Sequence, residues 1–338
     1  MPGTRMRILF DTNLPFSFAH GGVQVRYEHT VRELRALGVE TAPLEWWRDE
    51  LKGDVVHYFG RPNAYYVFFA QGKGVPVVFT HLLGALAARP RWIQRLQRVA
   101  MSGARAVLPA AMLNRLGWET YRLADACIAQ TQAEADLMVR FLGAPATRVH
   151  VLPNGVDSVF GPDPSIPRED WLLCVATLRA VKRVVELAEA AVAAGVPVRF
   201  VGKPYAAQDS YYRRFADLAG QHDEVIYEGP VENRAQLADL YRKARGFVLL
   251  SELESYSNAS AEAAACGCPL LLSDLPWARS VYGDRATYCR GRLDTANRAR
   301  VVGDFHAAAP TLPSPPAPLS WNDVARRLVE IYEAVLRR

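Results

Sequence analysis

Short apolar runs alternate with helical patterns from one end of the 338-residue chain to the other, and this alternation restricts the fold more than any other feature. In the first half, the runs are short, rich in residues that favour strands and bounded by polar or turn residues. These are the properties of strands buried in a parallel sheet. The runs lie at residues 7–10, 55–58, 77–80, 126–129 and 150–152.

A helix is predicted between the first two strands, at residues 25–38. Its apolar face consists of Val25, Val31, Leu34 and Leu37. Gly38 follows them and fits the left-handed position that ends many helices. The order strand, helix, strand predicts a mainly parallel sheet wrapped by helices.

A second series of the same kind begins after residues 153–170, a stretch rich in Pro, Gly and Asp. Its apolar runs lie at residues 171–177, 196–202, 224–230, 246–251 and 269–274, with helical patterns at 184–195 and 235–244. Half of the residues are hydrophobic and 22% are charged, which is a globular composition, and the length suits two domains. Two such series predict two Rossmann-like, doubly wound α/β domains facing a central cleft.

The chain ends in a predicted amphipathic helix, which follows the Pro-rich residues 311–320. Ser320 or Asn322 is suited to cap this helix, because short polar side chains accept hydrogen bonds from the first free amides. One apolar stripe runs along the helix and is formed by Val324, Leu328, Ile331 and Val335.

The net charge and the cysteines indicate the class of partner and the cellular compartment, but they do not select a function. The net charge of +5 favours anionic partners in general, such as nucleotide phosphates, anionic lipid or nucleic acid. The five cysteines are odd in number and form no CxxC pair, so we expect reduced, buried thiols in a cytoplasmic protein. The N-terminal residues lack the pattern of a signal peptide, and no apolar run approaches the roughly 20 residues that span a bilayer.

The sharpest functional signal is a pair of glutamates, Glu254 and Glu262, on either side of a turn from strand to helix. The pair follows the predicted strand 246–251, and ligands bind at the carboxyl ends of strands in open α/β sheets. The free amides at the start of the next helix favour an anion such as a diphosphate. Both carboxylates are expected to face the cleft and to accept hydrogen bonds from sugar or ribose hydroxyls.

Taken alone, two glutamates at this spacing have a simpler interpretation. Glu254 would cap the helix and Glu262 would form a salt bridge. The surrounding sequence decides between the two interpretations, because it belongs to a longer pattern.

That pattern resembles the signature of glycosyltransferase family 4. Glu-x7-Glu stands between an apolar strand that ends in Ser251 and a run of the type EAxAxGxPxxxSD. Further segments are similar to the family's motifs and occur in the same order: GGV at 21–23, DVVHYFG at 54–60, VVFTH ending at His81, ADACIAQTQAEADLM at 124–138, HVLPNGVDSVFGP at 150–162 and YEGPV at 227–231. The resemblance covers nearly the whole chain.

The resemblance implies the two-lobed GT-B fold. Residues 1–157 would form a Rossmann-like acceptor-binding domain, and residues 158–318 a Rossmann-like domain that binds the nucleotide-sugar donor. Residues 319–338 would form a C-terminal helix that packs back on the N-terminal domain.

The resemblance also implies a phosphate site in the second domain. Lys182 matches the lysine of the family's phosphate-binding Arg-Leu-x-x-x-Lys segment, whereas Thr177 stands where the arginine is usual. Arg179 or Arg183 would supply the missing charge, because a diphosphate is offset by roughly two cations or a metal. The other interpretation of Lys182 is a solvated helix start.

The remaining donor contacts come from the turn after the strand and from the first domain. Glu254 would hold the donor sugar and Glu262 the ribose, with Ser257, Asn258 and Ala259 lining the same turn. In the first domain, Gly21 and Gly22 would permit close approach of the backbone to the donor. His81 would hydrogen-bond the transferred sugar, and His57 is either structural or lines the cleft.

No nucleophile with a paired base is evident in the sequence, and neither is a DxD motif or a cluster of histidines with carboxylates. This fits a retaining reaction without an essential metal or cofactor, in which the leaving phosphate accepts the proton of the acceptor. The catalytic residues would be His81, Glu254 and Lys182.

Residues 89–122 form the most cationic stretch of the chain, with seven arginines, no lysine and a single acid, Glu119. Trp92, Leu96 and Val99 share a helical face beside Arg91, Arg95 and Arg98. Two interpretations stay open: a basic amphipathic surface that touches anionic membrane peripherally on its inner face, or an ordinary cationic surface helix. Nucleic acid is not an expected partner, because no binding module is recognised.

The sequence therefore predicts a retaining hexosyltransferase that uses a nucleotide-diphosphate sugar and a glycan or lipid-linked acceptor of cell-surface polysaccharide or glycolipid synthesis. The alternative is a GT-B protein that binds a nucleotide or sugar without turnover. The sequence leaves open the base and sugar of the donor, the acceptor and linkage, and the oligomeric state.

Overall fold

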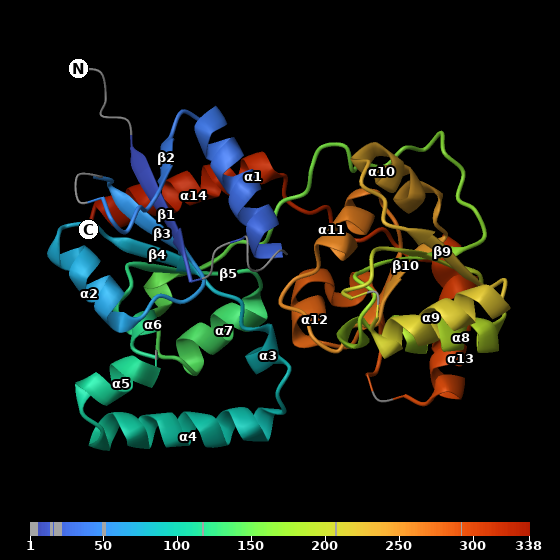
Figure 1. The fold of residues 1–338 in the computed structure, drawn as a ribbon, viewed down its shortest axis with the longest axis horizontal. Coiled ribbons are helices and arrows are strands. Elements are labelled where there is room, and N and C mark those ends of the chain that lie inside the picture. The colour runs from blue at the N-terminus through green and yellow to red at the C-terminus, as the bar shows by residue number, and fades with distance from the viewer. Residues whose placement is uncertain are drawn as a thin grey trace. The chain divides into compact units, whose positions relative to one another are not determined.

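The computed structural model describes residues 6–13, 16, 22–48, 52–116, 118–206, 208–291 and 293–338. The chain forms two compact units, each built around its own parallel sheet (Figure 1). The N-terminal unit comprises Met1–Gly155 together with Leu319–Arg338, and the C-terminal unit comprises Val156–Pro318. The chain therefore completes its second unit before the last helix returns to the first.

The sheet of the N-terminal unit has six parallel strands in the order β2-β1-β3-β4-β5-β6. The strands are β1 (Arg7–Thr12), β2 (Glu40–Pro43), β3 (Val55–Phe59), β4 (Val77–Thr80), β5 (Ala126–Ala129) and β6 (Val149–Val151). Every residue of β3, β4 and β5 is buried, which explains why these strands are continuous apolar runs rather than alternating ones. In the register of the central strands, Ile8 lies opposite Val55 and Val78 opposite Ala126.

Helices cover both faces of this sheet. They are α1 (Gly22–Ala36), α2 (Ala64–Gly72), α3 (Gly84–Ala87), α4 (Arg91–Val107), α5 (Ala110–Leu116), α6 (Thr120–Leu123), α7 (Gln132–Arg140) and α14 (Trp321–Leu336), with a 3-10 turn at Ala146–Arg148. Helices α1 and α14 pack side by side on one face, and α2, α6 and α7 lie on the other (Figure 1).

The last helix, α14, completes the core of the N-terminal unit. Ser320 caps it, because its hydroxyl accepts the amide of Asp323 while the Asp323 carboxylate accepts the amide of Ser320, each at 3.1 Å. The predicted apolar stripe of this helix is confirmed, because its four residues are buried against β1, β3 and α1. Burying an aliphatic side chain of this size stabilises the fold by roughly 1.5–3 kcal/mol.

The C-terminal unit repeats the plan with the strand order β12-β11-β10-β7-β8-β9, again parallel. Its strands are β7 (Leu172–Val175), β8 (Val198–Val201), β9 (Val225–Gly229), β10 (Gly246–Leu249), β11 (Leu270–Ser273) and β12 (Thr287–Cys289). Its helices are α8 (Val184–Ala194), α9 (Ser210–Gln221), α10 (Arg234–Lys243), α11 (Asn258–Ala265), α12 (Pro276–Tyr282) and α13 (Thr295–Ala308), with 3-10 turns at Ala180–Lys182, Gly283–Arg285 and Ala309–Thr311.

The ten predicted strands are present, but the sequence analysis missed β2 and β12, which form one edge of each sheet. Both are short, and β2 has the sequence ETAP, which carries no apolar run. Helix α1 begins earlier than predicted, at Gly22, and Val25 is exposed where the prediction placed it on the buried face. Arg26 is buried instead and donates to Asn154 Oδ1 at 3.0 Å, a contact that apolar periodicity does not reveal.

All five cysteines are buried and free, as expected. Burial raises the pKa of Cys174 to about 12, so this thiol is protonated and unreactive at neutral pH. Among the described residues, no helix combines the length and the apolar composition needed to cross a bilayer.

Candidate active site

The candidate residues of the C-terminal unit follow the carboxyl ends of the neighbouring strands β7 and β10, and the structure pairs two of them, Lys182 and Glu254. Strand β7 pairs with β8 on one side and with β10 on the other, so the direction of strand addition reverses between β7 and β10. The 3-10 turn Ala180–Lys182 follows β7, and the segment that carries Glu254 follows β10. Such a switch point is where open α/β sheets bind ligands.

Lys182 and Glu254 form an ion pair at this edge, between Nζ and Oε1. Their side chains are 23% and 12% exposed, so the pair is only partly screened by water. A backbone hydrogen bond of 2.8 Å from the Glu252 amide to the Val181 carbonyl ties the two segments together. Lys182 is therefore held in place and is not a freely solvated side chain at a helix start.

Arg183 and Arg179, the two candidates for the missing cation, differ in their surroundings. Arg183 is already engaged, because its Nε donates to Glu252 Oε1 at 3.0 Å and its guanidinium also donates to the Gly291 carbonyl. Its backbone is left-handed, with φ of 52°, a conformation that is uncommon outside glycine and is held here by these contacts.

Arg179 is exposed and has no ion pair among the residues that the structure describes. Its guanidinium carbon lies 5.4 Å from the centre of the Tyr205 ring, a cation–π contact that leaves its hydrogen-bond donors available. Of the two arginines, Arg179 is thus the one with donors to offer an anion.

The turn after β10 ends in the start of α11, as predicted. Ser257 caps the helix, and its hydroxyl accepts the Ser260 amide at 3.1 Å. Asn258 and Ala259 are the first two residues of α11. Glu254 is not the cap, so the simpler interpretation of this residue is wrong.

Glu262 lies in the second turn of α11 and is only 8% exposed. Its Oε1 is 3.0 Å from Arg234, and its Oε2 accepts the Tyr241 hydroxyl at 3.0 Å. Burial raises the pKa of Glu262, although Arg234 and Tyr241 act in the opposite direction. Glu262 therefore forms the salt bridge of the simpler interpretation. Each of its carboxylate oxygens retains a lone pair that can accept a further hydrogen bond.

His81 directly follows β4 in the N-terminal unit. Its Nδ1 is 2.5 Å from the Tyr121 hydroxyl. Burial lowers the pKa of His81 to about 4, so the imidazole is neutral at pH 7. The segment after it is fixed by Glu134, which accepts the Leu83 amide at 2.6 Å and the Gln130 amide at 3.1 Å.

His57 is structural. It is fully buried in β3, with Nδ1 2.5 Å from the Tyr332 hydroxyl and Nε2 2.9 Å from Thr80 Oγ1. Burial lowers its pKa to about 3, which keeps the ring neutral in the core.

Of the two predicted glycines, Gly21 lies outside the described residues. Gly22 opens α1, and a Cβ placed on it would meet no atom of the described residues within 4 Å. Packing against the described part of the chain therefore does not explain the glycine at position 22.

Sequence reasoning missed four residues that hold the predicted ones in place. They are Glu252, Arg234 and Tyr241 in the C-terminal unit and Tyr121 in the N-terminal unit. Glu252 was detectable in principle, because it lies two residues before Glu254 and would follow the same strand. The others come from helices distant in sequence, so no local pattern reveals them.

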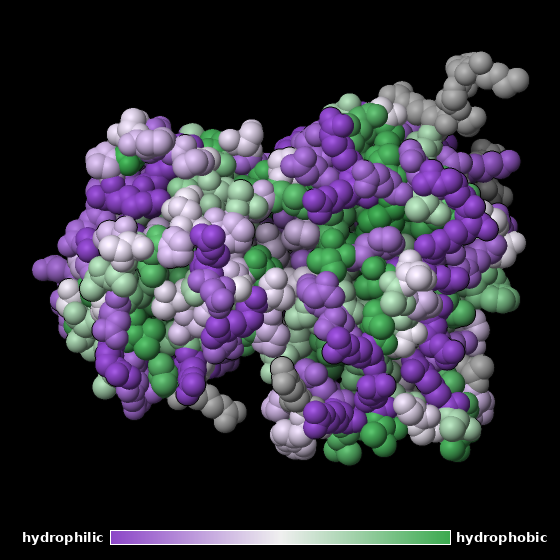
Figure 2. Space-filling model, turned by 180° about the vertical axis from the view of Figure 1, so that it is seen from behind, coloured by the Kyte–Doolittle hydropathy of each residue, from purple (hydrophilic) through white to green (hydrophobic). Residues whose placement is uncertain are grey.

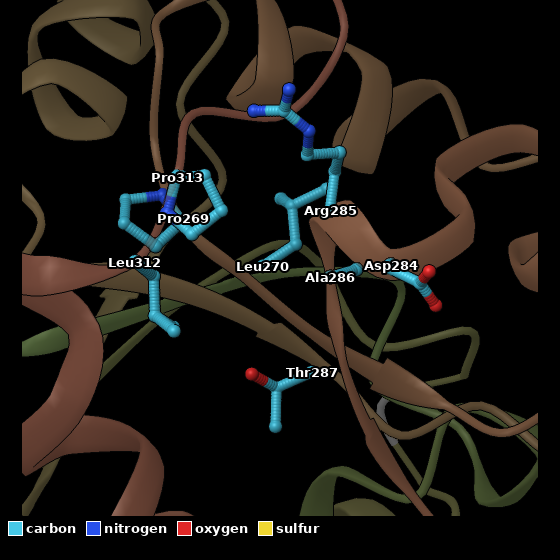
Figure 3. Close-up of a pocket in the computed structure, with 8 residues that line it drawn as sticks. All are labelled: Pro269, Leu270, Asp284, Arg285, Ala286, Thr287, Leu312 and Pro313. Carbon is cyan, nitrogen blue, oxygen red and sulfur yellow. The ribbon is translucent and has the colours of Figure 1, made fainter.

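No group of three or more His, Cys, Asp or Glu side chains arranged to hold a metal ion occurs within the described part of the chain. A small pocket of about 40 Å³ lies at the amino-terminal ends of β11 and β12, away from the candidate site. It is lined by Pro269, Leu270, Asp284, Arg285, Ala286, Thr287, Leu312 and Pro313 (Figure 3). Its volume suits a few water molecules, and it is too small for a nucleotide sugar.

Two regions of the chain match known families. Residues 41–160 match the family described as Glycosyltransferase Family 4, and residues 163–293 match the family described as Glycosyl transferases group 1. The curated relatives include a D-inositol 3-phosphate glycosyltransferase from Xylanimonas cellulosilytica, 28% identical over 251 residues that cover 63% of this chain and 58% of the relative. Another, from Catenulispora acidiphila, is 32% identical over 62% of this chain and 56% of the relative. The chain thus spans somewhat more than half the length of these relatives.

The solved structures that resemble this one include sucrose-phosphate synthase from Thermosynechococcus elongatus. Its TM-score is 0.69 at 14% identity, over 98% of this chain and 100% of that chain. Anabaena HepE in complex with UDP gives a TM-score of 0.64 at 15% identity, over 97% of this chain and 100% of that chain. At these identities the likeness concerns the fold. With two matched family regions and two parallel α/β units, the chain belongs to the family 4 glycosyltransferases and has the GT-B fold.

Proposed function

We propose that this protein transfers a hexose from a nucleotide-diphosphate sugar to an acceptor hydroxyl, with retention of configuration at the anomeric carbon. The observation that carries the proposal is the arrangement at the β7–β10 switch point. There, Lys182 and Glu254 are paired beside the Ser257-capped start of α11. A cation and the free amides at a helix start can bind a diphosphate, and a carboxylate can accept hydrogen bonds from sugar hydroxyls.

In this proposal the diphosphate competes with Glu254 for Lys182. A diphosphate carries more negative charge than one carboxylate. Lys182 therefore turns toward the leaving group, and Glu254 becomes available to the sugar hydroxyls. Arg179 supplies the second cation in place of an arginine at Thr177, because Arg183 is held by Glu252 and Gly291. Arg183 then serves to fix the turn that presents Lys182.

Glu262 would accept the ribose hydroxyls with its remaining lone pairs. The neutral ring of His81 would hydrogen-bond the transferred hexose, and Gly21 and Gly22 would admit the donor close to the backbone. The acceptor oxygen forms the new bond to the anomeric carbon as the bond to the diphosphate breaks, and the proton of the acceptor passes to the leaving phosphate. On this proposal neither an essential metal nor a cofactor takes part.

Named relatives and structural neighbours support the donor class. HepE has been solved with UDP and with UDP-glucose, and other relatives are D-inositol 3-phosphate glycosyltransferases. We propose a glycan or lipid-linked acceptor of cell-surface polysaccharide or glycolipid synthesis for this chain, which would place its work in the cytoplasm.

A second candidate is a protein that binds a nucleotide sugar without turnover. It is favoured by Thr177 at the usual arginine position and by the direct pairing of Lys182 with Glu254, which occupies both groups. The two candidates share a binding site and differ in whether the donor is cleaved.

Binding is tested by thermal unfolding with UDP, GDP, ADP and dTDP, with and without magnesium. A nucleotide at about 100 times its dissociation constant adds about 2.7 kcal/mol to the free energy of unfolding. Lys182→Met and Arg179→Ala should lose most of this gain. Lys243→Met is the matched control, because Lys243 pairs with Glu169 on the surface. If no nucleotide stabilises the protein, the donor site is misassigned.

Cleavage is tested with the nucleotide sugar of the base that binds. Release of nucleoside diphosphate without an acceptor, at a slow rate and undiminished by EDTA, is expected from the enzyme. Binding without release supports the second candidate, and complete loss in EDTA contradicts the metal-independent reaction. NMR of the anomeric proton of the product then tests retention.

A further inference from the structure

Arg234 lies at a position of the C-terminal unit that its own helix does not favour. Strongly hydrophilic residues are scattered over the surface of this unit, at left in Figure 2, so an arginine there is ordinary in itself. Arg234, however, is the first residue of α10, and this helix has no acidic residue in its first turn. A positive charge at the start of a helix opposes the helix dipole. The contacts of Arg234 beyond its helix must therefore explain the position.

Arg234 lies between two carboxylates. Its Nη2 is 2.8 Å from Asp157 Oδ2 and 3.0 Å from Glu262 Oε1. Asp157 belongs to the segment that opens the C-terminal unit, and Glu262 belongs to α11. Both carboxylate side chains are largely shielded from water, so their negative charges are poorly screened. Arg234 thus separates two like charges that would otherwise repel each other.

A closed set of contacts fixes the arginine and the carboxylate together. The guanidinium carbon of Arg234 lies 4.6 Å from the centre of the Phe160 ring, a cation–π contact. Phe160 meets the Tyr241 ring edge-on, with ring centres 5.8 Å apart. The Tyr241 hydroxyl in turn donates to Glu262 Oε2 at 3.0 Å. Arg234 and Tyr241 therefore each hold one oxygen of Glu262, which fixes the plane of the carboxylate.

The charge of Glu262 also depends on this arrangement. Burial raises the pKa of Glu262, Arg234 and Tyr241 lower it, and the like charge of Asp157 raises it further. The Cys266 thiol also faces Glu262 from the same helix, but burial raises its pKa to about 11, so it stays neutral. Arg234 is thus the positive charge that offsets both burial and Asp157.

We propose that Arg234 is a positioning residue that holds Glu262 as an oriented carboxylate for the ribose hydroxyls of the donor. The site then selects a ribonucleoside diphosphate over a deoxyribonucleoside diphosphate. The inference rests on the proposed function, because it requires the ribose of the donor to bind at Glu262. An ionised carboxylate only accepts hydrogen bonds, as two ribose hydroxyls require, whereas a protonated one loses part of this capacity.

The test compares UDP, GDP and ADP with their 2′,3′-dideoxy analogues, by isothermal titration calorimetry on the full chain between pH 6 and pH 9. The wild type should bind one of these ribonucleotides about 10- to 100-fold more tightly than its analogue, the usual range for a hydrogen bond to a charged group. This preference should grow with pH as Glu262 ionises. In Arg234→Met the rise should move to higher pH, and the two ligands should bind almost equally at pH 7. Arg234→Lys should recover part of the preference, because lysine keeps the charge but not the planar fork.

Arg242→Met is the matched control. Arg242 lies on the same helix and holds the same segment, since it donates to the carbonyls of Val159 at 2.7 Å and Gly161 at 2.8 Å. Its loss should lower the melting temperature but leave the preference for ribose, and the pH at which it rises, unchanged.

Three results would overturn the inference. Arg234→Met would weaken the ribonucleotide and its dideoxy analogue equally, as a purely structural loss does. The wild type would bind the two equally well, or would bind dTDP and none of the ribonucleotides. In each case the protein still binds a nucleotide, so the donor site is kept and only the role of Arg234 is lost. If no nucleotide binds the wild type, the donor site itself is misassigned and the inference fails with it.

Discussion

The two units share a plan of six parallel strands with helices on both faces, yet they bury polar groups in different ways. In the N-terminal unit, the neutral ring of His57 is fully buried between Tyr332 and Thr80, in a core that also buries Arg26 and Glu134. In the C-terminal unit, Lys182 and Glu254 form a partly exposed ion pair at the proposed donor site. We expect the neutral histidines to make the N-terminal unit sensitive to acid, and the proposed function requires the ion pair to exchange its carboxylate for a phosphate.

The largest expected effect comes from two glycines at which backbones meet, one in each unit. A Cβ on Gly202 would lie 1.9 Å from the Ala176 carbonyl oxygen, at a φ of 148°, and a Cβ on Gly155 would lie 2.5 Å from the Trp321 amide nitrogen. We expect Gly202→Ala to cost more than about 4 kcal/mol and to unfold the C-terminal unit. Gly155→Ala should displace α14 and destabilise the N-terminal unit instead.

Hydrogen exchange followed by mass spectrometry distinguishes these outcomes, because it reports protection for each segment. Gly195→Ala is the control, since Gly195 has a positive φ but no atom within 4 Å of its Cβ. It should cost only about 1 kcal/mol. Equal loss of protection in both units after either change would show that they unfold together.

The next effect is acid sensitivity of the N-terminal unit. Burial lowers the pKa of His57 to about 3 and that of His81 to about 4, below the usual value near 6.5. The unfolded chain binds these protons first, so stability falls as the pH drops from 6.5 toward the folded pKa values. At pH 5 each histidine should cost about 2 kcal/mol relative to neutral pH.

The C-terminal unit has an opposing contribution from Glu262. Its pKa is raised by burial, so the stability linked to it is full at low pH and is lost as the pH rises. Urea unfolding at pH 7 and pH 5, followed by hydrogen exchange, should show the N-terminal unit weakening more. His57→Gln should flatten the pH dependence of the N-terminal unit. A steeper loss in the C-terminal unit would contradict this account.

The sequence predicted the strands that position the candidate residues in both units, but not the partners that hold those residues in place. The turn after β10 and the start of α11 follow an apolar strand whose end is visible in the sequence, whereas Glu252, Arg234 and Tyr241 were missed. Buried Arg26 and the Tyr121 hydroxyl beside His81 depend on contacts between distant segments, which periodicity does not record. Edge strands β2 and β12 were missed because a short strand paired on one side needs no apolar run.

A smaller effect concerns the ion pair of the candidate site. In a double-mutant cycle of Lys182→Met and Glu254→Gln, we expect a coupling energy of about 1 kcal/mol, because the pair is partly buried. The comparison pair in the N-terminal unit is Arg7 with Glu40, at 3.1 Å and with side chains 33% and 50% exposed. Its coupling should stay below about 0.5 kcal/mol. Equal couplings, measured by urea unfolding, would remove the electrostatic distinction between the units.

The smallest effect tests the boundary of the N-terminal core, where the sequence prediction placed Val25 on the buried face of α1. Val25→Ser should change the free energy of unfolding by less than about 1 kcal/mol, because this side chain is 38% exposed. Leu34→Ala, on the same helix but fully buried, should cost about 2–5 kcal/mol. A cost for Val25→Ser above about 1 kcal/mol would mean that another part of the protein covers this face of α1 in solution. Equilibrium unfolding of the two variants in urea therefore measures where the core of the N-terminal unit ends.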